Sequence, residues 1–372
     1  MVDLDVPGPC DARDRSLPQP ARRLAAQDTR SEAGEPVNAH GPSPSPHPSA
    51  RRSEAPLLEV RDLTVEFKTR HGEVRALDRV SFDLRAGETL GIVGESGSGK
   101  SVTARSIMRL LPRNARVTGG EIRYDGRDLL TLSDREFRGI RGKAISMVLQ
   151  DPLTSLNPVF RIGWQVGEAV TIQQGLRGAA RDARSVDLLR GVNIPAPEIR
   201  LHNYPHEMSG GMRQRVVSAT ALAGNPRILI CDEPTTALDA TIQAQFLNLL
   251  RGLQEAYGLA IIFITHDFSV VAEMCDRVAV MYSGQIRERG DVFEIFDHPA
   301  HPYTRALLAS VPKLGETERL TTIPGQPPSS ANKLPGCAFA PRCPIADSVC
   351  HASEPPDMAL RDDHTSLCWR AQ

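Results

Sequence analysis

The chain has 372 residues, of which 40% are apolar and 24% are charged, and its formal net charge is −1. This apolar content can fill one large core or two smaller ones, and the near-zero charge argues against a surface that binds nucleic acid electrostatically. No apolar run approaches the roughly 18 residues of a membrane span, and the first residues lack the apolar segment of a secretory signal. We therefore expect a cytosolic chain.

Residues 1 to about 55 are rich in Pro, Ala, Arg, Ser and Asp, and they include GPSPSPHPS at 41–49. Such a composition cannot bury enough apolar surface to offset the entropy lost on ordering. We predict a disordered extension. A polyproline ligand for another protein is the alternative.

Patterned sequence begins at Leu57, and from there to about residue 300 apolar segments of strand length alternate with helical patterns. The predicted strands span 57–67, 80–84, 89–93, 144–149, 227–231, 259–264 and 277–281. This alternation is typical of an α/β domain with a parallel sheet. Beyond about residue 300 the chain becomes rich in Pro and Cys.

Residues 94–101 read GESGSGKS, a complete match to the phosphate-loop pattern G-x-x-x-x-G-K-[ST]. The match lies between the predicted strand 89–93 and a helix-like run at 102–111, and N–H groups at a helix N-terminus cradle anions. Lys100 can reach the β- and γ-phosphates of a nucleotide, and the Ser101 hydroxyl can ligate Mg²⁺. The predicted ATP-binding residues are Gly94, Glu95, Ser96, Gly97, Ser98, Gly99, Lys100 and Ser101.

Three other strand candidates end in residues that suit nucleotide chemistry: Asp232 and Glu233 follow one, His266 another and Gln150 the third. A carboxylate beside a phosphate loop can hold Mg²⁺, and the next carboxylate can polarise an attacking water. A single strand-end His is more often structural. The joint order of these residues favours a nucleotide-hydrolysing site.

Residues 208–215 read MSGGMRQR. Ser209, Gly210 and Gly211 at a helix start would make a second anion cradle, although a plain helix N-cap also explains them. Together with the motifs above, the segment resembles the signature of ATP-binding cassette (ABC) proteins. The resemblance implies an α/β P-loop NTPase of ABC type, with a RecA-like core, an antiparallel β subdomain, a helical subdomain and a small Cys-rich C-terminal extension. Met208 stands where the family usually has Leu, a volume-conserving change.

The resemblance also implies residue roles. Glu233 becomes the catalytic base, His266 the switch histidine at the γ-phosphate, and Gln150 the Q-loop residue that senses Mg²⁺ and water. Asp232 becomes the Walker B carboxylate. The implied Mg²⁺ site is formed by Ser101, Gln150 and Asp232.

In the family, the signature of one cassette caps the ATP held by the opposite subunit, so two cassettes enclose two nucleotides. The D-loop at 237–239, with Asp239, then crosses to the partner. Phe67 is either the aromatic residue that stacks on adenine or an ordinary core residue of its strand.

Two segments narrow the resemblance to a subgroup. DPLTSLNP at 151–158 and HPYTRALL at 301–308 look like the ATP-binding subunits of oligopeptide and dipeptide importers, and nickel importers share much of this pattern. The segment 151 to about 205 is then a helical subdomain whose surface receives a coupling helix from a membrane subunit. Phe160 and Trp164 either serve that groove or pack in the core.

The resemblance divides the chain into an extension at 1–55, a nucleotide-binding domain at 56–300 and an oligopeptide-importer C-terminal region at 301–372. It implies an ATPase at the cytoplasmic face of the cell (inner) membrane. Its expected partners are two permease subunits, an extracytoplasmic solute-binding protein and a second ABC ATPase. The subgroup commonly pairs two different cassettes, so we favour a heterodimer.

Four of the seven cysteines lie in the last 36 residues, at Cys337, Cys343, Cys350 and Cys368. Cytosolic redox conditions disfavour disulfides, and a Pro-rich segment with little core suits a structural metal. The gaps differ from the C-x2-4-C spacing of zinc sites, whereas iron–sulfur clusters accept looser spacing. Subgroup members with the full cysteine set resemble [4Fe–4S] carriers. We favour that cluster, with zinc and unligated thiols as alternatives.

Two other functional classes are less favoured. Soluble ABC ATPases that act on ribosomes or nucleic acid generally carry two cassettes or long insertions, and this chain has neither. A non-catalytic regulatory cassette would have a defective catalytic set, whereas Lys100, Asp232, Glu233 and His266 are all present. The transported solute is left open, with peptides favoured over nickel or another small solute.

Overall fold

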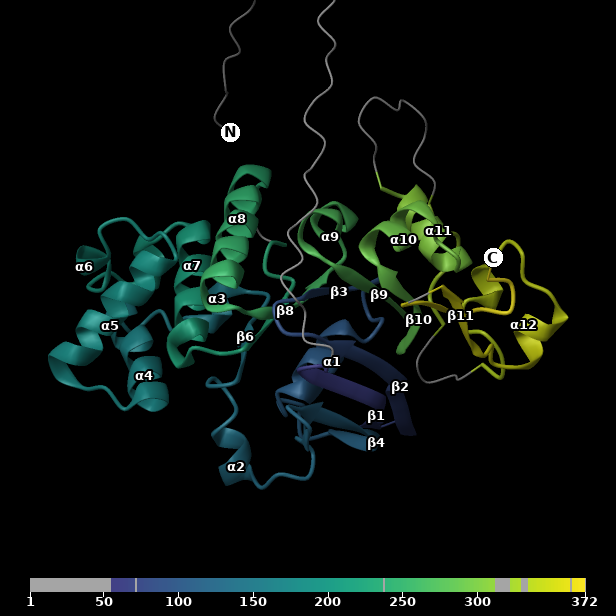
Figure 1. Cartoon of the computed structure of the whole chain (residues 1–372), viewed down its shortest axis with the longest axis horizontal. Helices are drawn as coiled ribbons and strands as arrows, with labels where there is room; N and C mark the ends of the chain where they lie inside the picture. Colours follow the sequence, from purple (N-terminus) through teal and green to yellow (C-terminus); the bar gives the residue numbers. More distant parts are fainter. Residues whose placement is uncertain are drawn as a thin grey trace, which may run out of the picture. The chain divides into compact units, whose positions relative to one another are not determined.

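The computed structural model describes residues 55–70, 72–236, 238–311, 322–328, 334–361 and 363–371, with positions 152 and 153 described by their backbone alone. The predicted disordered extension, apart from Ala55, and Ala237 of the predicted D-loop lie outside these residues. The described part is built on two sheets, one of four strands and one of eight (Figure 1). It is therefore an α/β fold, as expected.

The smaller sheet is antiparallel and has the order β2-β1-β4-β5. Its strands are β1 (Leu58–Thr69), β2 (Gly72–Leu84), β4 (Ala115–Tyr124) and β5 (Arg127–Asp128). One face carries buried side chains such as Val60, Phe82 and Ile122, which pack on a core shared with α1 (Lys100–Ile107). The alternation of buried and exposed residues explains why this sheet covers the core with one face only.

The larger sheet has the order β11-β12-β10-β9-β3-β8-β7-β6. Its strands are β3 (Thr89–Val93), β6 (Ile145–Val148), β7 (Ile228–Asp232), β8 (Ala260–Thr265), β9 (Arg277–Tyr282), β10 (Gln285–Asp291), β11 (Asp357–Arg361) and β12 (His364–Leu367). The strands β6, β7, β8, β3 and β9 run parallel, which confirms the predicted parallel sheet. Every residue of β3, β7, β8 and β9 is buried, as expected for strands covered on both faces.

A group of helices follows β6 and lies to one side of the sheet (Figure 1). It contains α3 (Pro152–Ser155), α4 (Ile162–Gln174), α5 (Gly178–Gly191), α6 (Pro197–Arg200), η1 (Pro205–Glu207), α7 (Gly210–Ala221) and η2 (Leu222–Gly224). The remaining helices are α2 (Asp134–Arg138), α8 (Ala240–Tyr257), α9 (Phe268–Met274), α10 (Val292–Asp297), α11 (Pro302–Ala309), η3 (Ala340–Arg342) and α12 (Ser348–Ala352).

The segment with four cysteines joins the larger sheet through its last strands. β12 pairs antiparallel with β10, and β11 pairs antiparallel with β12. The sequence analysis predicted neither β11 nor β12, because these polar segments lack an apolar strand pattern. The expected extension is thus continuous with the sheet that carries the phosphate loop.

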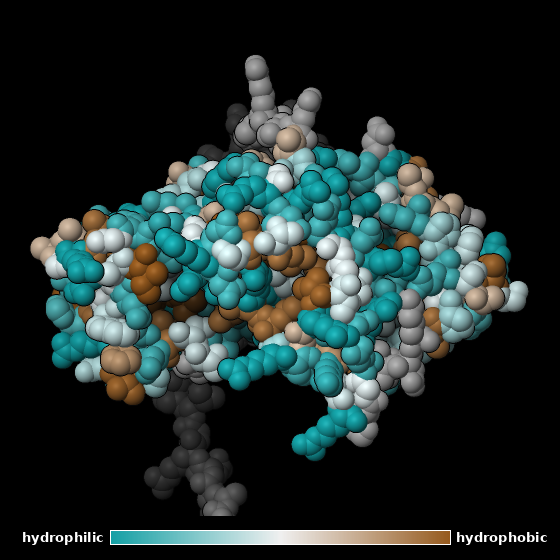
Figure 2. All heavy atoms as spheres, turned by 90° about the horizontal axis from the view of Figure 1, so that it is seen from below, coloured by the Kyte–Doolittle hydropathy of each residue, from teal (hydrophilic) through white to brown (hydrophobic). Residues whose placement is uncertain are grey.

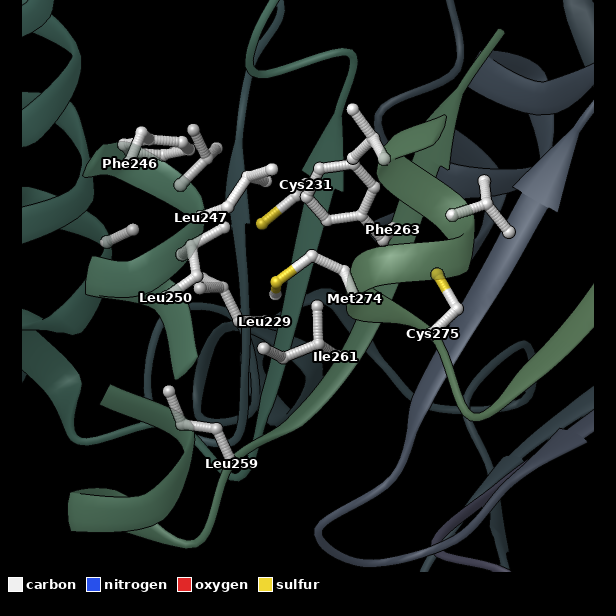
Figure 3. Packing of buried hydrophobic residues seen from close by; sticks show 14 of the residues in the cluster. Leu229, Cys231, Phe246, Leu247, Leu250, Leu259, Ile261, Phe263, Met274 and Cys275 are labelled. Atoms are coloured by element: carbon white, nitrogen blue, oxygen red, sulfur yellow. The ribbon is translucent and has the colours of Figure 1, made fainter. Parts of the chain in front are cut away.

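A core cluster fills the space between β7, β8, α8 and α9, and Figure 3 shows its side chains converging. Phe263, on β8, is fully buried there beside Leu229 and Met274. Cys231 and Cys275, which we expected to be plain core residues, are both buried, and burial raises the pKa of each thiol. This packing fixes the positions of the strand ends that follow β7 and β8.

Replacing Phe263 by Ala should lower the free energy of unfolding by about 3–5 kcal/mol, because it removes buried contacts and leaves a cavity. Urea titration of the full chain measures this. Phe293→Ala is the matched control, since that side chain is 72% exposed and should change stability by less than about 0.5 kcal/mol. Equal effects of the two substitutions would contradict the packing described here.

Candidate functional site

The phosphate loop, residues 94–101, lies between the end of β3 and the start of α1. Gly94, Gly97 and Gly99 have φ angles of 150°, 79° and 110°, a region that favours glycine. A Cβ on Gly94 would lie 2.1 Å from the carbonyl oxygen of Met281. The loop therefore needs glycine at this position both for its backbone angle and for its close approach to β9.

The Lys100 side chain lies within this loop. Its Nζ donates to the carbonyl oxygens of Gly94 at 2.7 Å and Glu95 at 3.0 Å, and the residue is buried. Burial lowers the pKa of Lys100, while the carboxylates of Glu233, Asp232 and Glu95 oppose that shift. The loop thus holds a cation where a bound phosphate would be.

Ser101 and Asp232 meet across the site. Ser101 Oγ donates to Asp232 Oδ1 at 2.9 Å, and Asp232 is buried at the end of β7. Burial raises the pKa of Asp232, and the hydrogen bond from Ser101 opposes the shift. A hydroxyl and a carboxylate at this separation are hard oxygen donors that suit Mg²⁺, so these two residues fit the cation that a phosphate-loop site needs.

Two further predicted residues, Gln150 and His266, lie next to Glu233. Its Oε2 accepts hydrogen bonds from Gln150 Nε2 at 2.9 Å and Thr236 Oγ1 at 3.2 Å, and it lies 3.7 Å from His266 Nδ1. The backbone at Glu233 has a φ of 47°, a left-handed conformation unusual for this residue type, and its N–H donates to Ile264 at 2.9 Å. The structure therefore brings the ends of β6, β7 and β8 together around one carboxylate.

Other predicted residues lie apart from this group. Ser209 caps the N-terminus of α7, where its Oγ accepts from the Met212 N–H at 3.3 Å, and α7 packs on α3, α4 and α5. Gly210 and Gly211 form the first turn of that helix, and a Cβ on Gly211 would clash with Ile242. The signature segment of this chain, Ser209–Gly211, therefore lies at the start of α7 in the helical group and not against the phosphate loop of the same chain.

Asp239 and Phe67 have local roles in the structure. Asp239 is exposed and caps α8 by accepting from the Ile242 N–H at 3.0 Å. Phe67 is half-buried on β1 and packs against the core beneath the smaller sheet. This packing is compatible with both interpretations of Phe67.

Two residues that the sequence analysis did not single out bind the phosphate loop from the C-terminal region. Arg342 forms a bidentate ion pair with Glu95, with Nη1–Oε2 at 2.7 Å and Nη2–Oε1 at 3.0 Å. The Glu95 N–H donates to the Tyr303 hydroxyl at 3.0 Å. Tyr303 lies within the HPYTRALL motif at 301–308, but that motif does not indicate which residue its side chain contacts.

The four cysteines of the C-terminal segment line a single cavity together with His301, Phe339 and Trp369. All four are free thiols, and burial raises the pKa of Cys343, Cys350 and Cys368. Among the residues that the structure describes, however, no three His, Cys, Asp or Glu side chains are arranged to hold a metal ion. The cysteines converge, but their present arrangement does not support the expected iron–sulfur cluster.

The hydrogen bonding of His301 indicates which kind of group this cavity could hold. Its Nδ1 accepts from the Tyr303 N–H at 3.0 Å, and burial lowers its pKa to about 3, so the ring is neutral and its proton sits on Nε2. That Nε2 is buried without a hydrogen-bond partner. An unpartnered N–H beside four thiols fits an anionic sulfur group in the cavity.

Two family models match the chain. Residues 77–236 match the ABC transporter model, and residues 288–350 match the C-terminal region of oligopeptide/dipeptide transporters. The oligopeptide transport ATP-binding protein OppD of Bacillus subtilis (strain 168) is 53% identical over 84% of this chain and 88% of its own length. The dipeptide transport ATP-binding protein DppD of the same strain is 51% identical over 84% of this chain and 94% of its own length.

Among solved structures, the chain is similar to the dimeric post-hydrolysis state of the ATP-binding cassette MJ0796 bound to ADP and Pi. The TM-score is 0.57 at 29% identity, over 63% of this chain and 98% of that one. The match accounts for the cassette fold that the sequence analysis expected. It leaves more than a third of this chain uncovered.

Proposed function

The chain belongs to the ABC transporter family and is similar along most of its length to the ATP-binding proteins of peptide transporters. On this basis we propose roles for its residues and partners. It is the ATP-hydrolysing subunit that energises a membrane importer of oligopeptides or dipeptides. The observation that carries the proposal is the convergence of Gln150, His266 and Glu233 beside the phosphate loop.

The chemistry is attack of water on the γ-phosphate. Lys100 and the loop N–H groups would bind the phosphates. Ser101, Asp232 and Gln150 would hold Mg²⁺, which would supply positive charge to offset that of the phosphates. Glu233 accepts the proton of the attacking water. Its side chain is oriented for this by the hydrogen bond from Gln150 and by the nearby His266 ring.

We infer that a second cassette completes the site. The signature segment at Ser209–Gly211 starts a helix whose N–H groups can bind an anion, yet that helix packs within the helical group of its own chain. In a head-to-tail pair it would cap the ATP of the partner, with Asp239 at the crossing. We favour a different cassette as that partner, because the importer subgroup commonly pairs two.

The helical group offers a surface for a membrane subunit. A groove lined by Leu149, Leu156, Ala169 and Ile172 lies between the end of β6 and α4, next to Gln150. Phe160 and Trp164 stack with ring centroids 4.2 Å apart, and both are exposed, so the core-packing alternative for them is wrong.

Figure 2 shows hydrophobic side chains at the surface on the side of this helical group. In the part of the chain that the structure describes, no helix is long and apolar enough to cross a membrane. We propose that separate permease subunits supply the membrane spans and place this chain at the cytoplasmic face of the membrane.

Peptides are the favoured solute because both the C-terminal family match and the named relatives belong to peptide transport. A solute-binding protein outside the membrane would deliver them to the permease. Nickel or another small solute is the competing cargo. The same C-terminal match disfavours a soluble ABC ATPase of ribosomes or nucleic acid.

We propose that Cys337, Cys343, Cys350 and Cys368 hold a [4Fe–4S] cluster, with zinc as the alternative. The four thiols line one cavity, and the unpartnered N–H of His301 would compensate the negative charge of thiolate and sulfide ligands. The role of the cluster would be structural or regulatory, because nothing among the described residues around it resembles a redox substrate pocket.

Replacing Glu233 by Gln should lower steady-state ATP hydrolysis by about 100-fold or more while ATP binding is kept, because the amide cannot accept the proton of the attacking water. Phosphate release by the complete transporter and nucleotide retention measure the two properties. Glu255→Gln, a change of a carboxylate on α8, is the matched control and should hydrolyse normally. Full turnover by the Glu233 variant would refute the assignment.

The full chain purified without oxygen should contain about four iron atoms and show visible absorbance from sulfide ligation. Cys368→Ser should lose both, because each thiolate is a ligand, whereas Cys275→Ser in the core should keep them. Stoichiometric zinc without iron, or iron retained by the Cys368 variant, would contradict the proposed cluster.

Gentle-detergent purification of the full chain from its native membrane should recover permease subunits and a second cassette. Trp164→Glu should lose the permease, because it places a charge on the apolar surface. Tyr257→Glu, at the far end of α8, exposes a similar fraction of its side chain and should keep the complex. Recovery with ribosomes and without membrane proteins would overturn the transport proposal.

A further inference from the structure

Glu95 connects the phosphate loop to the C-terminal region. Its carboxylate accepts hydrogen bonds from both terminal nitrogens of the Arg342 guanidinium, and its backbone N–H donates to the Tyr303 hydroxyl. Both partners are more than 200 positions away in sequence. The residue next to Gly94 in the loop is therefore held by a part of the chain outside the matched cassette segment, 77–236.

Arg342 is fixed on several sides. It is buried, and besides Glu95 it donates to the Tyr282 hydroxyl at 3.1 Å and to the Pro324 carbonyl oxygen at 2.9 Å. The hydrogen bond to Glu95, more than any other contact, raises the pKa of Arg342. Its guanidinium is thus a permanent, positioned charge rather than a mobile surface cation.

Arg342 also belongs to the segment with four cysteines. It immediately precedes Cys343, whose N–H donates to Ala340, and the Ala340 N–H in turn donates to the carbonyl oxygen of Cys337 at 2.9 Å. The backbone turn that carries Arg342 is thereby closed between two of the thiols that line the cavity. A change in how these thiols are held would move this turn.

Aromatic rings fill the space between the cysteine cavity and the loop. Phe339 lies 5.3 Å from Tyr303, 5.4 Å from Tyr282 and 5.9 Å from His301, measured between ring centroids. Phe339 and His301 both line the cysteine cavity, whereas Tyr303 touches the loop. Tightly packed rings transmit displacement because there is little free volume to absorb it.

We propose that Arg342 is a positioning residue for the phosphate loop, and that through its ion pair with Glu95 the state of the four-cysteine segment sets the affinity of the loop for nucleotide. The inference rests on the proposed function, since it concerns the same ATP site. It adds a route by which a segment remote from the chemistry acts on that site.

The physical reason is the charge of Glu95. Glu95 belongs to the phosphate loop itself, and its carbonyl oxygen accepts a hydrogen bond from Lys100 Nζ at 3.0 Å. Arg342 neutralises this carboxylate and holds it in one orientation. Without Arg342, the loop that would bind the triphosphate would carry an unpaired negative charge, and nucleotide binding would weaken.

The test is a double-mutant cycle on the full chain, with a fluorescent methylanthraniloyl-ATP and Mg²⁺ as the probe. Arg342→Gln should weaken binding about 5-fold or more, as expected for breaking a charged contact pair. Glu95→Gln together with Arg342→Gln should restore most of the affinity, because the repulsive carboxylate is gone. A purely structural role of Arg342 would leave the double variant as weak as the single one.

Cys368→Ser tests the link to the cysteine segment, because Cys368 is far from Arg342 in sequence. It should weaken binding in the wild-type background and have no further effect in the Arg342→Gln background. Equal affinity of Cys368→Ser and wild type would overturn the link. Arg361→Gln, which removes an exposed ion pair with Glu294 in the same region, is the control and should bind as wild type.

Thermal unfolding of each variant identifies any that does not fold. If Arg342→Gln does not fold, Arg342→Lys replaces it; this variant keeps the charge but loses the bidentate contact, so we expect an intermediate loss of nucleotide affinity. Unchanged binding in a folded Arg342 variant would overturn the inference alone. A wild-type chain that binds no probe would contradict the proposed function itself.

Discussion

The hydrogen bond between Ser101 and Asp232, at 2.9 Å, joins the phosphate loop after β3 to the end of β7, although 131 positions separate the two residues. It forms because the parallel strands β3, β8 and β7 end at the same edge of the sheet. The same register places Gln150 and His266 around Glu233. A slip of one strand by one residue would separate this group, so the site depends on the buried packing of the strands beneath it.

Much of this arrangement could be predicted from sequence. The GESGSGKS run has one well-defined structural meaning, and Asp232, Glu233 and His266 follow apolar segments that can only be buried strands. The strands β11 and β12 could not be predicted, because they are short and polar and are stabilised by pairing with a distant strand. The exposure of Trp164 also needed the structure, since an aromatic residue in a helical pattern is usually buried.

The contacts of Arg342 and Tyr303 with the phosphate loop could not be predicted from the sequence either. A conspicuous motif such as HPY shows that a segment is distinctive, but the partner of its Tyr lies 208 positions away and no local pattern names it. Long-range pairs of this kind follow from tertiary packing alone. They connect the region typical of peptide importers to the loop that all cassettes share.

One chain supplies only part of the catalytic site. The loop, the proposed Mg²⁺ ligands and the proposed catalytic carboxylate lie together, whereas the signature segment is held in the helical group by the packing of α7 on α4 and α5. Under the proposed function, such a division makes hydrolysis conditional on two cassettes closing. In the same proposal, a membrane subunit bound in the groove lined by Leu149 and Ile172 would bias that closure, because Leu149 directly precedes Gln150.

The most direct test of this account measures ATP hydrolysis and sedimentation of the full chain together, over a range of protein concentrations and with the partner cassette added. The account predicts that the monomer binds ATP but hardly hydrolyses it, and that turnover appears only as ATP drives two cassettes together. A chain that remains monomeric and hydrolyses ATP at the full rate would contradict it.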